Sequence, residues 1–345
     1  SQVFRLGGNL VVTRLLEPEM FGIMAIAFVV MQGLSMFSDL GFWAFIVRQK
    51  KDTDLHILNT VWTMQVIRGW VMFFILVMMV LGFITIKNIF GIESSSVYGE
   101  AVLPIILCVV GFTAVINGYK TMAPAVQSRE LKRGKLELIE LASQVAGIAI
   151  MLMWAWVSPS IWSLVSAGIV SALVSLILMY KVFPLRHQFE WDKNVVSKVF
   201  NFGKWIFLAS VLTYLAQQGD RLFFGAYISP AQLGVYSIAF MLANTLIAVT
   251  QQLSTKILFP VFSEAFNDEG QSLKAVYYKA RLRLDPLIYI AAGLLLALAP
   301  SIVELLYDER YIGAGWMLQI LTVLIVGTAL SSVAQECLSA LGETK

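Results

Sequence analysis

The stretch LVVTRLLEPEMFGIMAIAF, from Leu10 to Phe28, returns in altered form as LFFGAYISPAQLGVYSIAF, from Leu222 to Phe240. Each copy reads as the end of one helix, a turn that contains proline, and the start of another apolar run. A repeat of this kind predicts a chain built from two copies of one helical unit. The matching positions include Leu10, Pro18, Gly22, Ala27 and Phe28 in the first copy and Leu222, Pro230, Gly234, Ala239 and Phe240 in the second.

The composition of the chain predicts a membrane protein. Of its 345 residues, 58% are hydrophobic and only 14% are charged, whereas a typical soluble domain has about 25% charged residues. The apolar residues come in runs of about 20, the length that a helix needs to cross the hydrocarbon core. We therefore predict an all-α polytopic membrane protein with ten spans, at about 2–16, 20–46, 58–84, 98–118, 137–157, 160–183, 200–219, 232–259, 284–303 and 312–340.

The distribution of basic residues predicts the orientation. If the N-terminus is cytoplasmic, the inner linkers with the adjoining span ends and the C-terminal end hold 19 Lys and Arg residues, and the outer linkers with their adjoining span ends hold four. The positive-inside rule favours this arrangement. Six spans separate the two copies of the repeat, so both copies cross in the same direction. This predicts parallel six-helix repeats arranged as two lobes, rather than an inverted repeat.

The same count suggests how the chain is divided. Residues 1–183 are predicted to form an N-terminal lobe of six helices, the first of them truncated. Residues 184–199 mix aromatic and basic side chains and are expected to lie at the cytoplasmic surface as an amphipathic linker. Residues 200–345 form a C-terminal lobe with four spans, which is an incomplete copy. Because the chain opens at Ser1 inside a helical pattern, we expect it to be part of a longer protein.

No enzyme motif is present in the sequence. It has no phosphate-binding glycine loop, no His-Glu zinc pattern and no nucleophile elbow. Cys108 and Cys337 lie in apolar runs and read as small core residues. His56 and His187 fall in inner linkers, where solvated surface positions are expected. We predict a protein that is not an enzyme and that has no metal, no cofactor and no nucleic-acid partner.

Charged residues inside the apolar spans are the candidate functional residues. A charge near the bilayer centre costs about 2.5–3.5 kcal/mol on insertion scales, so these side chains are expected to face a wet interior or to pair. Arg68 can bind an anionic ligand, because its donor fork matches phosphate oxygens. It can also pair with Asp39, or extend to the membrane surface. Arg5 and Lys204 are the other candidate cations for a substrate cavity.

The candidate acidic residues and amides have alternative roles too. Asp39 is a candidate for a coupling cation or proton, or for a structural cap or salt bridge, and the repeat places Gln251 at the equivalent position. Asp220 is a similar candidate, or a partner of the adjacent Arg221. Buried amides either line a polar cavity for sugar or join helices. The candidates for a polar cavity lining are Asn9, Gln65, Asn117 and Gln251.

Several motifs in order along the chain resemble the polysaccharide transporter family. They are NLVVTRLLEPEMFGIMAIAFVV from Asn9, FSDLGFWAFIVRQK from Phe37, NTVWTMQVIRG from Asn59, and LLYDERYIGAGWMLQILTVLIVGTALSSVAQECLSALGETK from Leu305. This family includes the Wzx-type flippases of lipid-linked oligosaccharides. It belongs to the MOP superfamily, together with the MATE exporters. The resemblance covers essentially the whole chain.

The resemblance implies a flippase for polyprenyl-diphosphate-linked oligosaccharide in the bacterial inner membrane. Such a protein serves the synthesis of exopolysaccharide, capsule or lipopolysaccharide. Family members have 12–14 spans in a MATE-like two-lobed bundle, have cytoplasmic termini and work by alternating access, driven by a proton or sodium gradient. Cationic cavity residues hold the diphosphate or anionic sugars, and Arg5, Arg68 and, as a weaker match, Lys204 are the candidates here. The implied partners are the lipid-linked oligosaccharide, membrane lipids, a polysaccharide polymerase and glycosyltransferases.

Two other functions compete with this interpretation. A MATE-like cation-coupled multidrug exporter would need carboxylates for its cationic substrates. The candidate intramembrane set instead holds four cations and two anions. A membrane glycosyltransferase or polymerase would need a large outer loop with catalytic acids. The longest outer linker, about 85–97, has one acidic residue, Glu93. The sequence therefore favours the flippase.

Overall fold

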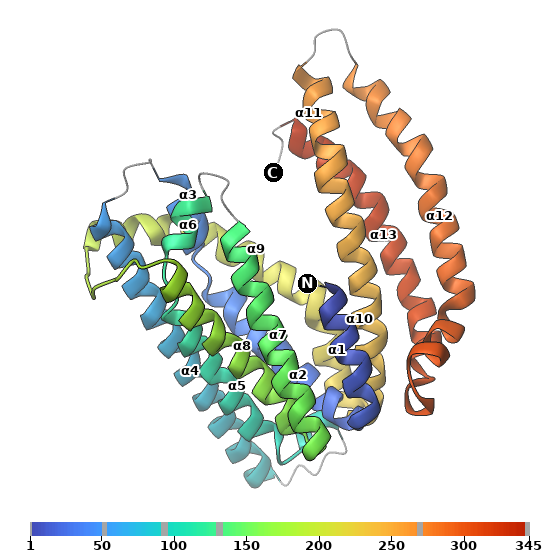
Figure 1. The fold of residues 1–345 in the computed structure, drawn as a ribbon, viewed down its shortest axis with the longest axis horizontal. Coiled ribbons are helices and arrows are strands. Elements are labelled where there is room, and N and C mark those ends of the chain that lie inside the picture. The colour runs from blue at the N-terminus through green and yellow to red at the C-terminus, as the bar shows by residue number, and fades with distance from the viewer. Residues whose placement is uncertain (1, 50–53, 91–95, 129–133, 268–271, 342–345) are drawn as a thin grey trace. The chain divides into compact units, whose positions relative to one another are not determined.

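The computed structural model describes residues 2–49, 54–90, 96–128, 134–267 and 272–341. Within these residues the regular structure is helical, and no strand occurs. The chain divides into two compact units, Ser1–Gly234 and Val235–Lys345. Figure 1 traces the helices of each unit in chain order.

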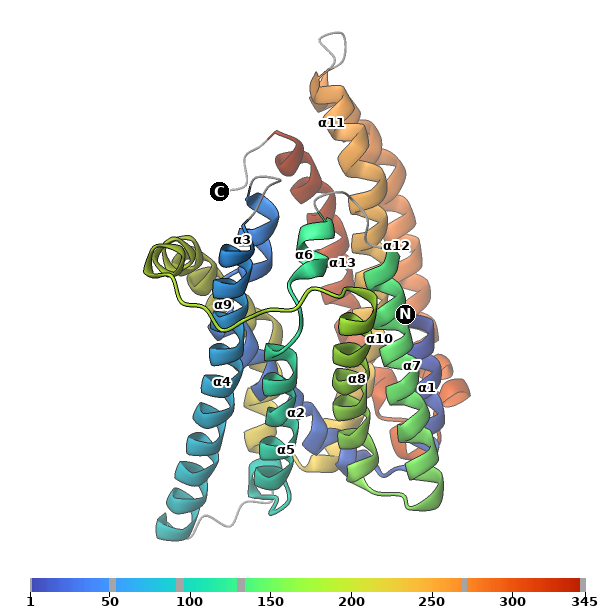
Figure 2. The ribbon, with the colours of Figure 1, turned by 60° about the vertical axis from the view of Figure 1, so that its left-hand side comes forward.

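The first unit consists of paired helices around an apolar core. The α4 helix lies beside α5, and α7 lies beside α8 (Figures 1 and 2). Its helices are α1 (Gln2–Leu15), α2 (Pro18–Ser38), α3 (Phe42–Arg48), α4 (Leu55–Phe90), α5 (Leu103–Gly118), α6 (Ala123–Ser128), α7 (Gly134–Val157), α8 (Ile161–Val182) and α9 (Lys193–Tyr227), with a 3₁₀ turn at Val97–Gly99.

The second unit contains most of α10 (Pro230–Leu253), which begins in the first unit. A π-helical turn at Ser254–Leu258 carries α10 directly into α11 (Phe259–Asn267). The remaining helices are α12 (Leu273–Leu306) and α13 (Ala314–Ala340), joined through a 3₁₀ turn at Glu309–Tyr311. The α12 and α13 helices pack side by side (Figure 1).

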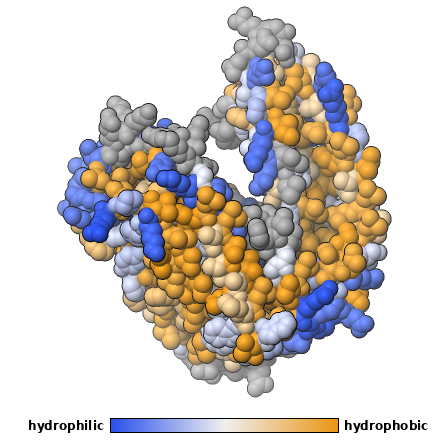
Figure 3. Space-filling model, in the orientation of Figure 1, coloured by the Kyte–Doolittle hydropathy of each residue, from blue (hydrophilic) through white to orange (hydrophobic). Residues whose placement is uncertain are grey.

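The helices have the length and surface of membrane spans. The described residues include seven helices long and apolar enough to cross a bilayer, or eight if the bent α9 helix counts as one span. Hydrophobic residues cover most of the visible helix sides in Figure 3. On α4 the outward face carries Val71, Phe74, Ile75 and Met78, all exposed, which in water would be a large apolar patch. The predicted polytopic helical class is confirmed, and the count of ten spans stays a prediction.

One predicted span is wrong in its second half. The expected helix over 20–46 ends at Ser38, and a separate helix, α3, starts at Phe42. Between them Gly41 adopts a φ of 67°, a left-handed conformation that strongly favours glycine. The apolar run FWAFIV continues past this break, so hydropathy alone could not show it.

Small residues set how closely the helices approach. A Cβ added at Gly69 of α4 would lie 2.7 Å from the Ala114 carbonyl oxygen of α5. One added at Gly147 of α7 would lie 2.7 Å from the Ala167 carbonyl oxygen of α8. Backbones that approach this closely are typical of helix pairs in membranes, where van der Waals packing replaces the hydrophobic driving force.

The α9 helix packs along α2, which explains where the first unit ends. The Tyr214 hydroxyl donates to the Val29 carbonyl at 3.1 Å, and the Gln218 amide donates to Gln32 at 3.0 Å. Nearer the end of α9, Gly225 lies against the Ile26 side chain. The compact units therefore divide at Gly234 and not at the predicted linker. The assignment of lobes at 1–183 and 200–345 stays a prediction.

The predicted linker is part coil and part helix. Residues 184–192 form an extended strap, and α9 begins at Lys193. Figure 2 shows this strap running from α8 across the end of the unit toward the start of α9. The first part of α9, Lys193–Gly203, is bent by 43° from Phe207–Tyr227. It buries Val195 and Val199 and leaves Phe200 exposed.

Candidate functional site

The end of α2 is the best-defined polar site among the predicted residues. Arg68, in the middle of α4, points its guanidinium at the last turn of α2. Its Nε donates to the Ser38 hydroxyl at 2.9 Å, and one Nη donates to the Ser35 carbonyl at 2.8 Å. The other Nη lies 3.5 Å from an Asp39 carboxylate oxygen. Arg68 therefore caps the C-terminus of α2, where carbonyl groups lack helical partners and the helix dipole favours a cation.

Asp39 stabilises the break that follows α2. Its carboxylate accepts a hydrogen bond from the Gly41 backbone N–H at 2.9 Å, an Asx turn. Gly203 of α9 packs against this turn, since a Cβ there would lie 2.8 Å from the Leu40 carbonyl oxygen. The sequence left open whether Asp39 pairs with Arg68, and the structure places these two side chains together. A role of Asp39 toward a coupling ion stays a prediction.

The Arg68 side chain is only partly used by these contacts. It is 21% exposed, and Asp39 is 48% exposed. A guanidinium has five N–H donors, and the hydrogen bonds given above use two of them. Its central carbon also lies 5.8 Å from the centre of the Phe42 ring, within the range of a cation–π contact. The site therefore places the Arg68 guanidinium beside a helix end and leaves some of its N–H donors for an anionic oxygen.

Gln65 joins helices instead of standing free. Its amide nitrogen lies within hydrogen-bond distance of three carbonyl oxygens just after or within the last turn of α5, those of Asn117, Gly118 and Lys120, at 2.9–3.1 Å. A Cβ added at Gly118 would lie 3.2 Å from the Gln65 carbonyl oxygen, so the two helices touch at this level. This contact supports the helix-joining role that the sequence left open for Gln65. The side chain of Asn117 is exposed.

The structure locates the remaining predicted residues on other helices. Arg5 lies in α1 and Lys204 in α9, but their side chains fall outside the described part of the structure. Asn9 and Asp220 are half-buried on α1 and α9, and Gln251 is exposed on α10. The described residues therefore bring together Arg68 and Asp39 from the predicted set, and the role of the others is still a prediction.

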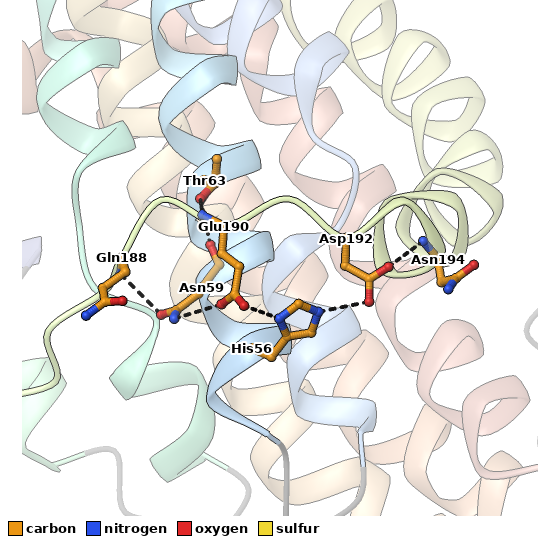
Figure 4. Close-up of polar contacts among 7 residues, drawn as sticks. All are labelled: His56, Asn59, Thr63, Gln188, Glu190, Asp192 and Asn194. Carbon is orange, nitrogen blue, oxygen red and sulfur yellow. Dashed lines mark hydrogen bonds and ion pairs between the residues drawn. The ribbon is translucent and has the colours of Figure 1, made fainter.

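The strap after α8 forms a second polar cluster, which the sequence did not predict (Figure 4). His56, at the start of α4, contacts Glu190 through Nδ1 and lies 2.9 Å from Asp192 through Nε2. The Asn59 amide donates to Glu190 at 3.0 Å, and the Thr63 hydroxyl accepts from the Glu190 backbone N–H at 3.1 Å. The hydrogen bonds from His56 lower the pKa of both carboxyl groups. This cluster fastens the strap to the first two turns of α4.

His187 holds the other end of the strap by packing. Its ring stacks on Trp62 with a centroid distance of 5.4 Å. Its Nε2 accepts a hydrogen bond from the Met122 backbone N–H at 3.2 Å and lies 3.0 Å from the Thr121 hydroxyl. Burial lowers the pKa of His187 to about 4, so the ring is neutral near pH 7. The expectation of a solvated surface histidine is therefore wrong for His187, because Trp62 of α4 covers it.

Lys120 is a further basic residue whose surroundings differ from the expected open linker. It follows α5 and is half-buried, and burial lowers its pKa although the charge of Glu140 acts in the opposite direction. No sequence pattern could have found Lys120 or His187. His187 is covered by Trp62 of α4, and Lys120 is influenced by Glu140 of α7, and both of these partners lie on other helices.

Two curated proteins with names that refer to polysaccharide synthesis are similar to this chain in sequence. The succinoglycan biosynthesis transport protein ExoT of Rhizobium meliloti (strain 1021) is 23% identical over 297 residues, which cover 86% of this chain and 57% of that protein. The lipopolysaccharide biosynthesis protein WzxC of Escherichia coli (strain K12) is 21% identical over 319 residues, which cover 91% of this chain and 61% of that protein. The chain thus spans about three fifths of the length of these curated relatives.

The fold has a solved counterpart. An inward-facing structure of a multidrug resistance MATE family transporter of the MOP superfamily matches 99% of this chain and 82% of its own chain, with a TM-score of 0.69 and 15% identity. At this identity the likeness shows the fold alone, and it confirms the predicted MATE-like architecture. Residues 11–316 match the family described as polysaccharide biosynthesis protein. The chain belongs to this family of membrane proteins.

Proposed function

We propose that this chain belongs to a flippase that moves polyprenyl-diphosphate-linked oligosaccharide across the bacterial inner membrane. Family membership and the printed roles of the succinoglycan and lipopolysaccharide relatives support a transport step in polysaccharide synthesis. The MATE-like fold supports alternating access as the mechanism. On this proposal the protein is a transporter and not an enzyme, and the cell's polymerase acts on the oligosaccharide that it delivers.

The observation that carries the proposal is the placement of Arg68. Its cation lies in the middle of a long apolar helix, is fixed by Ser35 and Ser38, and is 21% exposed. An intramembrane Arg with donors to spare is suited to a diphosphate, since guanidinium–phosphate bonds are charge-assisted and bidentate. We propose that Arg68 contacts the diphosphate of the cargo while Asp39 keeps the guanidinium in place.

The experiment compares Arg68→Ala with Arg281→Ala in cells that lack the chromosomal copy of the protein. Arg281 of α12 is a matched control, because it too pairs with a carboxylate, Asp285 at 3.0 Å, and donates to a backbone carbonyl, that of Leu330 at 2.8 Å. We expect Arg68→Ala to abolish surface polysaccharide at a normal membrane level. Arg281→Ala should lower the melting temperature with polymer still made. Normal polymer output from Arg68→Ala would remove the proposed ligand role.

A binding measurement separates ligand contact from structural support. Farnesyl diphosphate, a short prenyl diphosphate, should raise the melting temperature of the purified wild-type protein and of Arg281→Ala. It should have little effect on Arg68→Ala, and an intermediate effect on Arg68→Lys, because an ammonium lacks the planar fork. Equal shifts in all four proteins would assign Arg68 a structural role only.

A second candidate function is export of cationic compounds, which the fold likeness to a multidrug transporter favours. The described site argues for the flippase instead, because its central group is a cation, which repels a cationic substrate. The test is efflux of ethidium from cells that express the chain. Efflux that depends on Asp39, with polysaccharide unchanged on deletion, would favour the exporter.

We also propose that the N-terminus is cytoplasmic, with the strap and α3 on the inner side of the membrane. The support is the excess of basic residues in the linkers assigned to that side. Single cysteines at Ser158 and Ser272, which are both exposed, should then react with an impermeant maleimide from opposite sides. In intact cells Ser158→Cys should be labelled and Ser272→Cys protected, and labelling of both from outside would contradict the proposed topology.

A further inference from the structure

The two copies of the repeat touch through the residues that revealed the repeat. A Cβ added at Gly22 of α2 would lie 2.0 Å from the Pro230 carbonyl oxygen, and one added at Gly234 of α10 would lie 1.8 Å from the Pro18 carbonyl oxygen. The same added atoms would lie 3.0 Å from the Gly234 nitrogen and 3.2 Å from the Gly22 nitrogen, respectively. All four residues belong to the first compact unit.

This contact is reciprocal. The glycine of each copy meets the proline carbonyl of the other, which is the pattern of a two-fold interface in which residue i contacts j and j contacts i. Here the two surfaces belong to one chain and are related by its internal repeat. Parallel repeats related by an axis along the membrane normal are expected to meet in this way near that axis.

The contact is made of backbone, so any side chain larger than hydrogen would separate the helices. Among the glycines that the structure describes, these two make the shortest approaches. A carbon normally stays about 3.3–3.6 Å from a carbonyl oxygen, so an alanine at either position requires a shift of more than 1 Å. A contact of glycine and carbonyl groups also buries little side-chain area, so it can open and close at a modest cost in free energy.

The contact and the Arg68 site lie at opposite ends of α2. Gly22 is in its first turns and Asp39 directly follows its last residue, about 25 Å away at 1.5 Å per residue. The copies thus meet at the end that the charge pattern assigns to the outer side, and the α2 break lies at the other end. A transporter that exposes its site to one side at a time needs a closure at the opposite side.

We propose that Gly22 and Gly234 form the outer closing contact of the transport cycle, and that the first turns of α2 and α10 separate when the protein opens outward. The contact itself follows from the geometry alone. Its role in opening and closing rests on the proposed function. Pro18 and Pro230 contribute the carbonyl groups, and their missing N–H groups suit the first position of a helix. The contact positions two helices and does not itself bind cargo.

The first experiment measures the contact without any transport assay. The full-length protein, with Cys108 and Cys337 replaced by alanine, carries cysteines at Glu19 and Ala231, each next to a contacting proline. A reducible bis-maleimide should join them in the purified protein. Gly22→Ala and Gly234→Ala should each lower the yield, and by similar amounts, because the contact is reciprocal. A yield as high as in the parent protein would overturn the proposal.

Two glycines serve as matched controls. Gly219 of α9 has no atom within 4 Å of an added Cβ, so Gly219→Ala should leave the crosslinking yield unchanged. Gly147→Ala places a Cβ against the Ala167 backbone within the α7–α8 pair. It should lower the melting temperature and leave the crosslinking yield of the folded protein at the parental value. A loss of crosslink in Gly147→Ala equal to that in Gly22→Ala would mean that the yield reports only general loosening.

The second experiment asks whether the contact must open. Crosslinking in intact cells should lower polysaccharide output by roughly tenfold or more, since a locked gate stops the conformational step, and reduction should restore the output. Single-cysteine proteins treated in the same way should be unaffected. Normal polysaccharide output from the crosslinked protein would disprove the closing role of the contact and leave the proposed flippase function unaffected. If the crosslink behaves as expected but polymer never depends on the protein, the proposed function fails and the contact stands.

Discussion

The two copies of the repeat begin alike and end differently. Both start a helix with Pro-x-x-x-Gly, at Pro18 and at Pro230. The first copy breaks after Ser38 into a left-handed turn, whereas the second runs on through a π-helical turn into α11. The positions equivalent to Asp39 and Gly41 hold Gln251 and Leu253.

The physical reason for this difference is local. A turn at φ of 67° costs roughly 1–2 kcal/mol for a residue with a Cβ, so leucine disfavours it and glycine accepts it. Asp39 adds a hydrogen bond to the Gly41 N–H, and Arg68 caps the helix end. The comparison teaches that two helices with similar beginnings end differently because a few residues differ, and that only the first ends in a polar, partly exposed site.

Replacing Gly41 by leucine, the residue at the equivalent position of the second copy, should have the largest effect. Gly41→Leu forces a β-carbon into the left-handed conformation, and we expect a loss of about 1–2 kcal/mol together with displacement of Asp39 from Arg68. Thermal unfolding in detergent measures the loss. Gly41→Asn should cost less, because asparagine tolerates this conformation. Equal stability of wild type and Gly41→Leu would mean that the turn does not require glycine.

The reverse exchange should have a smaller effect. Leu253→Gly introduces glycine within helical backbone, at a cost of about 1 kcal/mol, and Gln251→Asp alone should change little. Together they should loosen the passage from α10 to α11, which faster amide hydrogen exchange over 250–258 would report. Unchanged exchange in the double variant would show that the tertiary structure, and not these two residues, keeps the second copy helical.

Neutralising the carboxylate should have a smaller effect still. Asp39→Asn keeps an oxygen that can accept from the Gly41 N–H and removes only the charge beside Arg68. Since Asp39 is 48% exposed and 3.5 Å from the guanidinium, we expect a stability loss below about 1 kcal/mol. Asp39→Ala, which removes the turn bond as well, should lose more. If Asp39→Asn instead stops polysaccharide output at normal stability, the carboxylate has a role beyond holding Arg68.

Acid should weaken the packing of His187, which holds one end of the strap. The pKa of His187 is lowered to about 4 by burial, so a released strap would bind a proton near the ordinary value of 6.5 and the packed strap would not. The contribution of His187 to the free energy that holds the strap is therefore constant above pH 6.5 and falls as the pH drops toward 4. The hydrogen bonds to Glu190 and Asp192 raise the pKa of His56, so the contribution of His56 is lost as the pH rises through that raised value and opposes the effect of His187. In a His56→Gln protein, which lacks this opposing effect, limited proteolysis between Phe183 and Lys193 should be faster at pH 5 than at pH 7.5.

A variant isolates the histidine in that measurement. His187→Gln keeps a side-chain acceptor for the Met122 N–H and cannot titrate. Added to the His56→Gln protein, it should make the proteolysis rate the same at both pH values, although stacking on Trp62 is lost. The lowered pKa of Glu190 and Asp192 adds a second loss, confined to pH values below their ordinary range. In the His56→Gln protein, a strap equally protected at pH 5 and 7.5 would contradict the neutral, buried state of His187.

Much of the fold could be predicted from the sequence, because hydropathy reports helices that face lipid. The helices over 134–157 and 161–182, for example, lie within a few residues of the predicted spans. The break after Ser38 could not be predicted in this way, since FWAFIV keeps the apolar run going. Its signal was Asp-x-Gly, which has a turn-forming meaning only if something caps the helix end.

The candidate site was predicted in part. Charge within apolar spans singled out Arg68 and Asp39, and three alternatives for Arg68 were visible, but spacing could not choose among them. The role of Gln65 depends on the carbonyl groups at the end of α5, fifty residues away. His187 was expected to be solvated because it falls in an inner linker, and the packing of the strap on Trp62 buries it.

The sequence by itself determined that this is a helical membrane protein with an internal repeat, because the hydrophobic effect and the cost of buried charge act on composition and order. It also determined the family, through motifs in order along the chain. Only the tertiary structure decided that Gly22 meets Pro230 and that Arg68 caps α2. Those contacts join segments far apart in sequence, and their energies depend on distances of a few ångströms that no local pattern encodes.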